Sequence, residues 1–385
     1  MKAVIAVVLF ALALIIPESS HALPYFSRQV GRDCSFCHVL FPKLNEQGRV
    51  FRSNGYRFEA EGSWKDVRDW TTFPAAMEIT LNAFHRKNAS SGVQTTSSDM
   101  GIDEFEMFSS GAFGKTGAVS AYGSFNIKQS DSGGTTTYPL SVTNAAISVN
   151  DLIGPAGAGA LNLKAGQTQL TLPFLGGNQR IFDRAYLAET LGVFTKAARV
   201  AELNGAVVAP EESGDPEYRP THRYSAGIVR EDVNKDAKLK GLYATYTATF
   251  AEKLSLGAIL RHGQQRQGAA DIDYDRYGLA AEGTLAPVIL DAGVFRIERA
   301  GMNRQTDYLL EALYMPMPRL STGARLDIVK ENYLGTAKTY VLMARYNILS
   351  NTYTSIEYQW LRDGSHITGS NENDRRVRLF LVSVF

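Results

Sequence analysis

The chain has few cysteines, little net charge and no long apolar segment after its first residues. Only two cysteines occur among 385 residues, which excludes a disulfide-rich secreted scaffold. Beyond residue 16 no apolar run approaches the ~20 residues of a membrane-spanning helix. The formal net charge is +1, which argues against a nucleic-acid partner, because such a partner needs a basic face. A β-barrel stays allowed, since its strands alternate polar and apolar residues.

The first residues have the three parts of a secretory signal. Lys2 supplies the positive start, residues 3–16 are apolar, and Ser20-His21-Ala22 places small residues around a larger one. The alternative is a membrane anchor, but the apolar stretch is short for a bilayer. We therefore expect residues 1–22 to be a signal peptide that is cleaved after Ala22.

Both cysteines lie in the motif Cys34-Ser35-Phe36-Cys37-His38. Two thiols three positions apart can each add to one vinyl group of the same porphyrin, and the following histidine can then ligate the iron. A disulfide or a thioredoxin-like redox pair is the alternative, but the redox pair needs a βαβ context. A zinc site needs further Cys or His ligands, and none is close in sequence. The motif predicts one covalent haem c, with Cys34 and Cys37 as tethers and His38 as the proximal iron ligand.

The sequence after the motif predicts a short helix within residues 41–56. Pro42 suits a first helical turn, and Asn54-Gly55 is a helix stop. One face of this helix consists of Leu44, Gly48 and Phe51. This face packs either on the porphyrin, with Gly48 allowing close approach, or in an ordinary small core.

From about residue 75 onward the pattern changes to period two. Along residues 320–328 the two faces differ, with apolar residues and Thr322 on one and Ser321, Gly323, Arg325 and Asp327 on the other. Strands of about ten residues that are apolar outside and polar inside are typical of an outer-membrane barrel. Aromatic residues recur near strand ends, where the interfacial girdles of a bilayer lie; examples are Phe250, Tyr340, Tyr353 and Trp360.

About sixteen such segments occur, although fourteen or eighteen is also compatible with the pattern. Sixteen strands leave an aqueous lumen with room for a small haem domain. The predicted strands begin near Ala75, Asp103, Ala118, Leu140, Ala160, Arg199, His222, Lys240, Lys253, Asp275, Pro287, Thr306, Arg319, Thr336, Thr352 and Arg375.

These patterns divide the chain into three parts and leave two segments outside the strand rhythm. We predict a signal peptide over 1–22, a haem-bearing, partly α-helical segment over 23–70, and an all-β transmembrane antiparallel barrel over 71–385. Residues 166–198 form either a loop folded into the pore or a surface loop. Residues 210–220 are acidic and contain proline, so we expect an exposed loop.

The order of parts and the first segment resemble the fused monohaem cytochrome–porins of the outer membrane, found in iron-oxidising bacteria and their relatives. The resemblance covers about thirty-five residues and rests on Ala22–Gln29, the Cys34–His38 motif, Phe41–Asn45, Gly48–Phe51 and Asn54–Tyr56. It implies a short cytochrome plugged into a barrel in the outer membrane of a Gram-negative bacterium. It also implies haem attachment at Cys34 and Cys37 with ligation by His38.

The resemblance further implies one-electron transfer from extracellular Fe(II) to a periplasmic c-type cytochrome, with outer-membrane lipid around the barrel. Relatives in metal-reducing bacteria leave the direction of electron flow open, so electron export to an extracellular acceptor is an alternative. A second alternative is a diffusion porin with a structural or sensory haem plug. A peroxidase of this kind would need a second Cys-x-x-Cys-His motif, and the chain has no further cysteine.

The motif does not identify the sixth ligand of the haem iron. Met77 is the candidate that we carry forward, because a methionine ligand raises the reduction potential. Further candidates near the first two predicted strands are His85, Met100 and Met107, and each is equally well explained as an ordinary barrel residue.

Overall fold

The structure is a computed structural model that describes residues 25–58, 75–90, 93–132, 135–177, 179–208, 221–230, 241–267, 270–301, 304–332, 335–363 and 373–385. The predicted signal peptide and the predicted acidic loop, residues 210–220, lie outside the described residues. Within these residues, no helix has the length and apolar character needed to cross a membrane.

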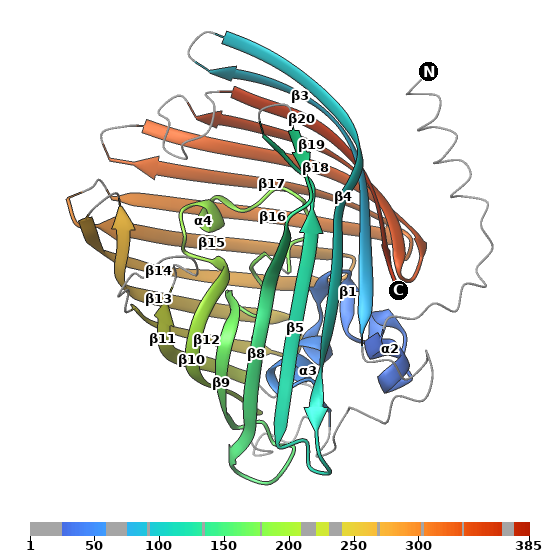
Figure 1. Ribbon diagram of the computed structural model, residues 1–385, viewed down its shortest axis with the longest axis vertical. Coiled ribbons are helices and arrows are strands. Elements are labelled where there is room, and N and C mark those ends of the chain that lie inside the picture. The colour runs from blue at the N-terminus through green and yellow to red at the C-terminus, as the bar shows by residue number, and fades with distance from the viewer. Residues whose placement is uncertain are drawn as a thin grey trace.

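In the described residues, sixteen antiparallel strands close into one barrel (Figure 1). The first eight are β3 (Ala76–Ser90), β4 (Val93–Phe113), β5 (Val119–Lys128), β8 (Leu140–Ile153), β9 (Leu161–Leu170), β10 (Thr195–Val208), β11 (Thr221–Arg230) and β12 (Gly241–Phe250). The others are β13 (Leu254–Gln267), β14 (Ala270–Leu285), β15 (Val288–Arg299), β16 (Gln305–Met317), β17 (Leu320–Glu331), β18 (Gly335–Leu349), β19 (Thr352–Asp363) and β20 (Asn373–Val384). The predicted all-β antiparallel barrel and its predicted number of about sixteen strands are confirmed.

The barrel closes between its first and last strands. β20 pairs with β3, and Phe385 extends the pairing because Phe385 N donates to Met77 O at 2.8 Å and Phe385 O accepts from Met77 N at 3.0 Å. This end of the barrel also has the short turns, such as 286–287, 318–319 and 350–351, and we call it the turn end. The opposite end is the loop end.

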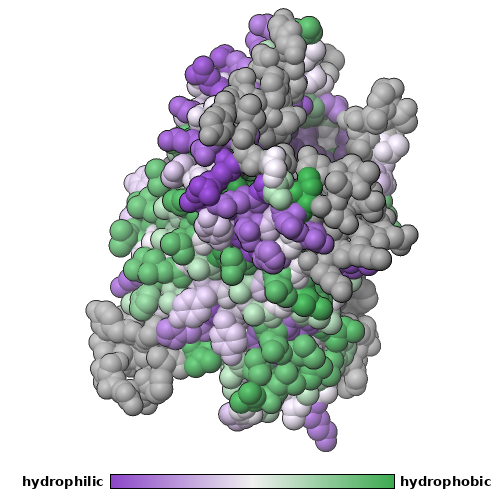
Figure 2. Space-filling model, turned by 90° about the vertical axis from the view of Figure 1, so that its left-hand side faces the viewer, coloured by the Kyte–Doolittle hydropathy of each residue, from purple (hydrophilic) through white to green (hydrophobic). Residues whose placement is uncertain are grey.

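Apolar side chains cover the outside of the barrel and polar side chains line its inside. Leu242, Leu279 and Leu310 are 59%, 69% and 55% exposed, which is the alternation that a lipid-facing strand requires. Figure 2 shows hydrophobic side chains gathered over large parts of one side of the barrel. The inward residues predicted for residues 320–328, Arg325 and Asp327, are buried.

A segment from the N-terminus fills the turn end of the lumen. It consists of helix α2 (Tyr25–Val30), the 3₁₀ turn η1 (Cys34–Phe36), a β1–β2 hairpin (His38–Leu40 and Lys43–Leu44) and helix α3 (Glu46–Ser53). Helix α3 begins later than expected, because Asn45 and not Pro42 caps it, its side chain accepting from Gly48 N at 3.0 Å. The predicted stop is confirmed, since Asn54 ends the helix and Gly55 takes a φ of +66°.

Residues 171–194, between β9 and β10, also lie inside the barrel. They include the short helix α4 (Leu187–Thr190) and form a buried apolar core with inward residues of β13 to β18. The hypothesis of a loop folded into the pore is therefore correct. The loop covers 171–194 rather than 166–198, because the flanking residues belong to β9 and β10. We call these residues the inserted segment. The hairpin β6–β7 (Ser130–Ser132 and Thr135–Thr137) stands apart from the barrel sheet.

The N-terminal segment and the inserted segment together correct the expectation of an aqueous lumen. The aqueous lumen predicted for sixteen strands would be lined by inward charges, namely Arg325, Asp327, Arg345 and Glu357. In the structure these four side chains are buried, and they bind backbone groups of the N-terminal and inserted segments instead. Alternation along a strand predicts that a residue faces inward, but not what occupies the lumen beside it.

Candidate functional site

The Cys-x-x-Cys-His motif forms a tight turn inside the barrel. Phe36 N donates to Asp33 O at 2.9 Å, and Cys37 N donates to Cys34 O at 3.2 Å, so the backbone coils once through η1. His38 follows directly and begins strand β1. This coil brings the two thiols and the imidazole that sequence spacing predicted as a group to the edge of one cavity.

Helix α3 braces this turn from one side. Asn45 N donates to Cys37 O at 3.0 Å, and its side chain donates to Phe36 O at 3.0 Å. A Cβ atom at Gly48 would overlap the Cys37 carbonyl oxygen, so only glycine permits this contact. Gly48 therefore permits close approach to the backbone of the motif itself, and the predicted helix face of Leu44, Gly48 and Phe51 borders the cavity.

The His38 ring is held in one orientation by a backbone oxygen. Its Nδ1 lies 3.2 Å from Pro42 O, where a protonated Nδ1 donates and leaves Nε2 as a lone-pair nitrogen. Burial lowers the pKa of His38 to about 4, against the opposing effect of the Pro42 hydrogen bond. A neutral imidazole with one nitrogen satisfied by the backbone is the form in which histidine ligates a metal.

The two cysteines have the character of protonated thiols. They are not joined in a disulfide. Burial raises the pKa of Cys34, although a contact with Ser27 Oγ at 3.6 Å opposes this, and burial raises the pKa of Cys37 to about 11. A thioredoxin-like pair works through a thiolate whose pKa is lowered, so this environment disfavours the redox-pair alternative.

The motif borders a cavity of about 440 Å³ between the N-terminal segment and the barrel wall. This volume lies within the ~300–1,000 Å³ typical of small-molecule and cofactor sites. Stacked aromatic rings line part of it: Tyr56 lies 5.2 Å from Tyr122 and 6.3 Å from Phe26 between ring centroids. Two thiols, a neutral imidazole and a broad aromatic lining are a donor set that fits a c-type haem.

The structure does not bring the candidate sixth ligands to this cavity. Glu78 and Thr80 of β3 line it, so Met77 lies on the other face of that strand. His85 and Met100 are exposed, and His85 hydrogen-bonds Ser98 Oγ at 2.8 Å. Among the described residues that line the cavity, His38 is the sole histidine and none is a methionine, so Met107 is absent from it as well.

Three or more His, Cys, Asp or Glu side chains do not come together as a metal-ion site anywhere in the described part of the chain. The carboxylates around the cavity, Glu78, Glu104 and Glu106, are therefore not arranged as a ligand cage.

Buried ion pairs fix the N-terminal segment to the barrel wall. Lys43 Nζ lies 2.8 Å from both Glu282 and Asp291, and it donates to Phe174 O of the inserted segment at 3.2 Å. Arg49 binds Glu282 as well. Sequence reasoning missed these anchors, because alternation placed Glu282 and Asp291 on barrel strands without indicating partners some two hundred residues away.

Two further contacts complete the attachment. Glu46 of α3 pairs with Arg223 of β11, and Arg57 pairs with Asp151 at the turn end. Because removing one partner of a buried ion pair costs several kcal/mol, these contacts hold the segment as a fixed plug.

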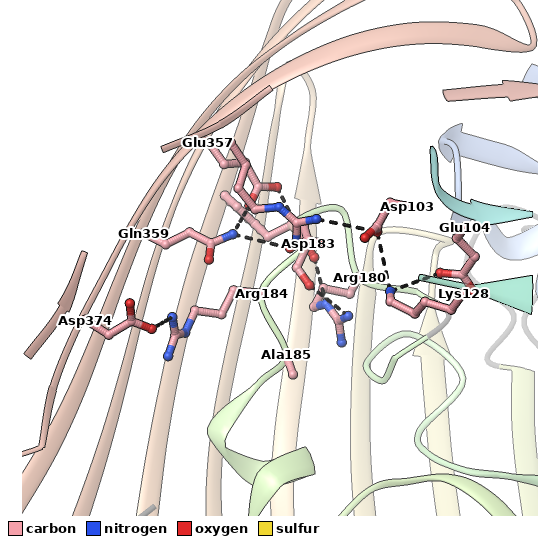
Figure 3. A network of polar contacts seen from close by, with 12 residues as sticks. Asp103, Glu104, Lys128, Arg180, Asp183, Arg184, Ala185, Glu357, Gln359 and Asp374 are labelled. Atoms are coloured by element: carbon pink, nitrogen blue, oxygen red, sulfur yellow. Dashed lines mark hydrogen bonds and ion pairs between the residues drawn. The ribbon is translucent and has the colours of Figure 1, made fainter. Parts of the chain in front are cut away.

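A polar network fastens the inserted segment to β19 and β20 (Figure 3). Asp183 accepts from Arg378, and its backbone amide donates to Glu357 Oε1 at 2.7 Å. Arg378 and Lys128 lie within 3.4 Å of Asp103. Burial raises the pKa of Asp183, but the positive charges of Arg378, Arg180 and Lys128 outweigh it and lower the pKa below its usual value. The carboxylate of Asp183 is therefore negatively charged.

No family model matches the chain, and no curated protein matches it in sequence. The fold nevertheless has close likenesses among solved structures.

An anion-selective porin from Comamonas acidovorans is similar with a TM-score of 0.57 at 10% identity, over 81% of this chain and 98% of the porin. OmpF of Salmonella typhi, in complex with daunomycin, is similar with a TM-score of 0.57 at 12% identity, over 81% and 97% of the two chains. The outer-membrane channel DcaP of Acinetobacter baumannii has a TM-score of 0.56 at 11% identity, over 81% and 97%. At these identities the likeness establishes the fold alone, which is the closed sixteen-stranded antiparallel barrel of outer-membrane porins.

Proposed function

We propose that this chain is an outer-membrane barrel that binds one c-type haem inside its lumen and serves one-electron transfer across that membrane. The observation that carries the proposal is the placement of Cys34, Cys37 and His38 together at one cavity within the barrel. The apolar outer face and the porin fold support the outer-membrane location. With the termini and short turns on the periplasmic side, as in bacterial barrels, the turn end faces the periplasm.

The residues of the chain have separate tasks in this proposal. Cys34 and Cys37 would tether the haem, and His38 would hold its iron through Nε2 while Pro42 O keeps Nδ1 protonated. A bound haem supplies one-electron redox chemistry. Lys43 and Arg49 keep the whole segment fixed, so that the cavity stays at the periplasmic end.

The electron donor and acceptor are proposed from the resemblance of the N-terminal residues to fused cytochrome–porins. Each extracellular ferrous ion would lose one electron and leave as a ferric ion, and a periplasmic c-type cytochrome would take that electron. The apolar band of such barrels is ~25 Å tall, so a single haem cannot span it and the periplasmic partner must approach the turn end. In the alternative, electron export, the electron would pass from the periplasmic cytochrome through the same haem to an extracellular acceptor.

A diffusion porin with a haem plug is the second candidate function. The similarity to solved porins and channels favours it, whereas the plug and the inserted segment, both buried in the lumen, oppose free passage. Small solutes would need a passage past the plug in this function, and a second cavity of about 140 Å³ borders α3 at Arg49, Arg52 and Ser53.

Two measurements on the purified full-length protein separate these functions. In stopped-flow mixing with ferrous iron, the electron-transfer proposal expects the haem absorbance to change to that of the reduced form. In planar bilayers it expects conductance far below that of an open sixteen-stranded porin. Haem that stays oxidised with ferrous iron but is reduced by dithionite would exclude iron as the donor. Porin-like conductance together with that result would establish the diffusion function instead.

A further inference from the structure

Three arginines converge on the lumen side of the barrel, near the loop end. Arg86 of β3 and Arg376 of β20 are direct register partners on neighbouring strands. Arg184 reaches the same place from the inserted segment, and its Nη1 lies 3.4 Å from Asp374 Oδ2. Like charges placed directly opposite each other destabilise a sheet, so this arrangement needs a compensating partner.

Among the described residues, Asp374 supplies part of that compensation. Asp374 binds Arg86 through both carboxylate oxygens, at 2.7 and 3.1 Å, and also binds Arg184. Within the described part of the chain, this one carboxylate is shared by Arg86 and Arg184, so the three guanidinium groups carry two more positive charges than it balances. Burial first, and then Arg325 and Arg86, lower the pKa of Arg184 even though Asp374 opposes them.

Arg376 is the member with no carboxylate bound to it in the described residues. Its guanidinium carbon lies 5.6 Å from the centroid of the Phe84 ring, and its Nε is buried without a hydrogen-bond partner among those residues. The carboxylate of Asp183 is engaged by Arg378 and by Gln359. A buried donor left unpaired costs free energy, and guanidinium groups bind oxyanions through paired hydrogen bonds.

We propose that Arg86, Arg184 and Arg376 form a binding site for a small multivalent oxyanion of the phosphate class, entered from the loop end of the barrel. Such an anion balances the two positive charges that Asp374 leaves among the described residues and accepts a hydrogen bond from Arg376 Nε. None of these three arginines is among the described residues that line the cavity of Cys34 and His38, so the site is a different one. The proposed oxyanion site depends on the geometry of the three arginines and not on the proposed haem function.

The test is isothermal titration of the purified full-length protein with inorganic phosphate at low ionic strength. We expect saturable binding to the wild type, and Arg376→Gln is expected to raise the dissociation constant about tenfold, as when one hydrogen bond to a charged group is lost. Arg375→Gln is the matched control, because Arg375 is exposed on the outer face, 5.2 Å over the Trp360 ring, and its loss is expected to leave binding unchanged.

Two results would overturn the proposal. One is the absence of saturable phosphate binding to the wild type, which needs no variant. The other is a dissociation constant for Arg376→Gln equal to that of the wild type. If Arg376→Gln does not assemble as a barrel, Arg86→Gln takes its place, with the same tenfold weakening expected.

Discussion

His38 and Pro42 show how a backbone oxygen selects the chemistry of a side chain. The Nδ1 hydrogen bond leaves Nε2 as the nitrogen available to a metal, and the tight η1 turn places both thiols beside it. The sequence motif predicted these three residues as a group, because covalent attachment needs that spacing. It did not predict Pro42 as the partner of the ring, since Pro42 was expected within a helix.

His38→Ala tests this arrangement at the residue scale. We expect the haem to remain covalently attached through Cys34 and Cys37 but to show an altered absorption spectrum, with the wild-type spectrum restored by added imidazole. The spectrum is the measurement. Met77→Leu is the control, because Met77 lies on the face of β3 away from the cavity and its loss is expected to change nothing. An altered spectrum in Met77→Leu would restore Met77 as a ligand.

At the scale of elements, the N-terminal segment behaves as a plug because charged residues on it meet charged residues on the wall. Strand alternation predicted that Arg325 and Asp327 of β17 face the lumen, and the helix stop at Asn54-Gly55 was also predictable. The pairing of Lys43 with Glu282 and Asp291 was not, because it depends on how the plug sits and no local pattern records that. The same applies to the inserted segment, whose burial follows from apolar residues meeting inward side chains of distant strands.

Lys43→Ala is expected to loosen the plug. It leaves Asp291 buried without its cation, and breaking one partner of a buried pair costs about 3–5 kcal/mol. Single-channel recording should show frequent openings that the wild type lacks. Lys253→Ala is the matched control, since Lys253 is exposed in the turn before β13. Equal conductance in Lys43→Ala and the wild type would mean that this ion pair does not hold the plug.

The whole molecule depends on closure between its first and last strands. Phe385 contributes two backbone hydrogen bonds to Met77 at that seam. We expect deletion of Phe385 to reduce the yield of folded barrel in the outer membrane, measured as the heat-modifiable species on a gel. Recovery of that species at the wild-type level would show that the terminal aromatic residue is dispensable. Fractionation of the full-length protein with the soluble periplasm would contradict the membrane location itself.

The account as a whole rests on covalent haem inside the barrel. The direct measurement is the intact mass of the purified chain after treatment with acidified organic solvent, for the wild type and for Cys34→Ala combined with Cys37→Ala. We predict that the wild type retains a mass equal to the polypeptide plus one haem, and that the double variant has the mass of the polypeptide alone. A wild-type chain whose haem extracts into the solvent, or which carries none, would contradict the account.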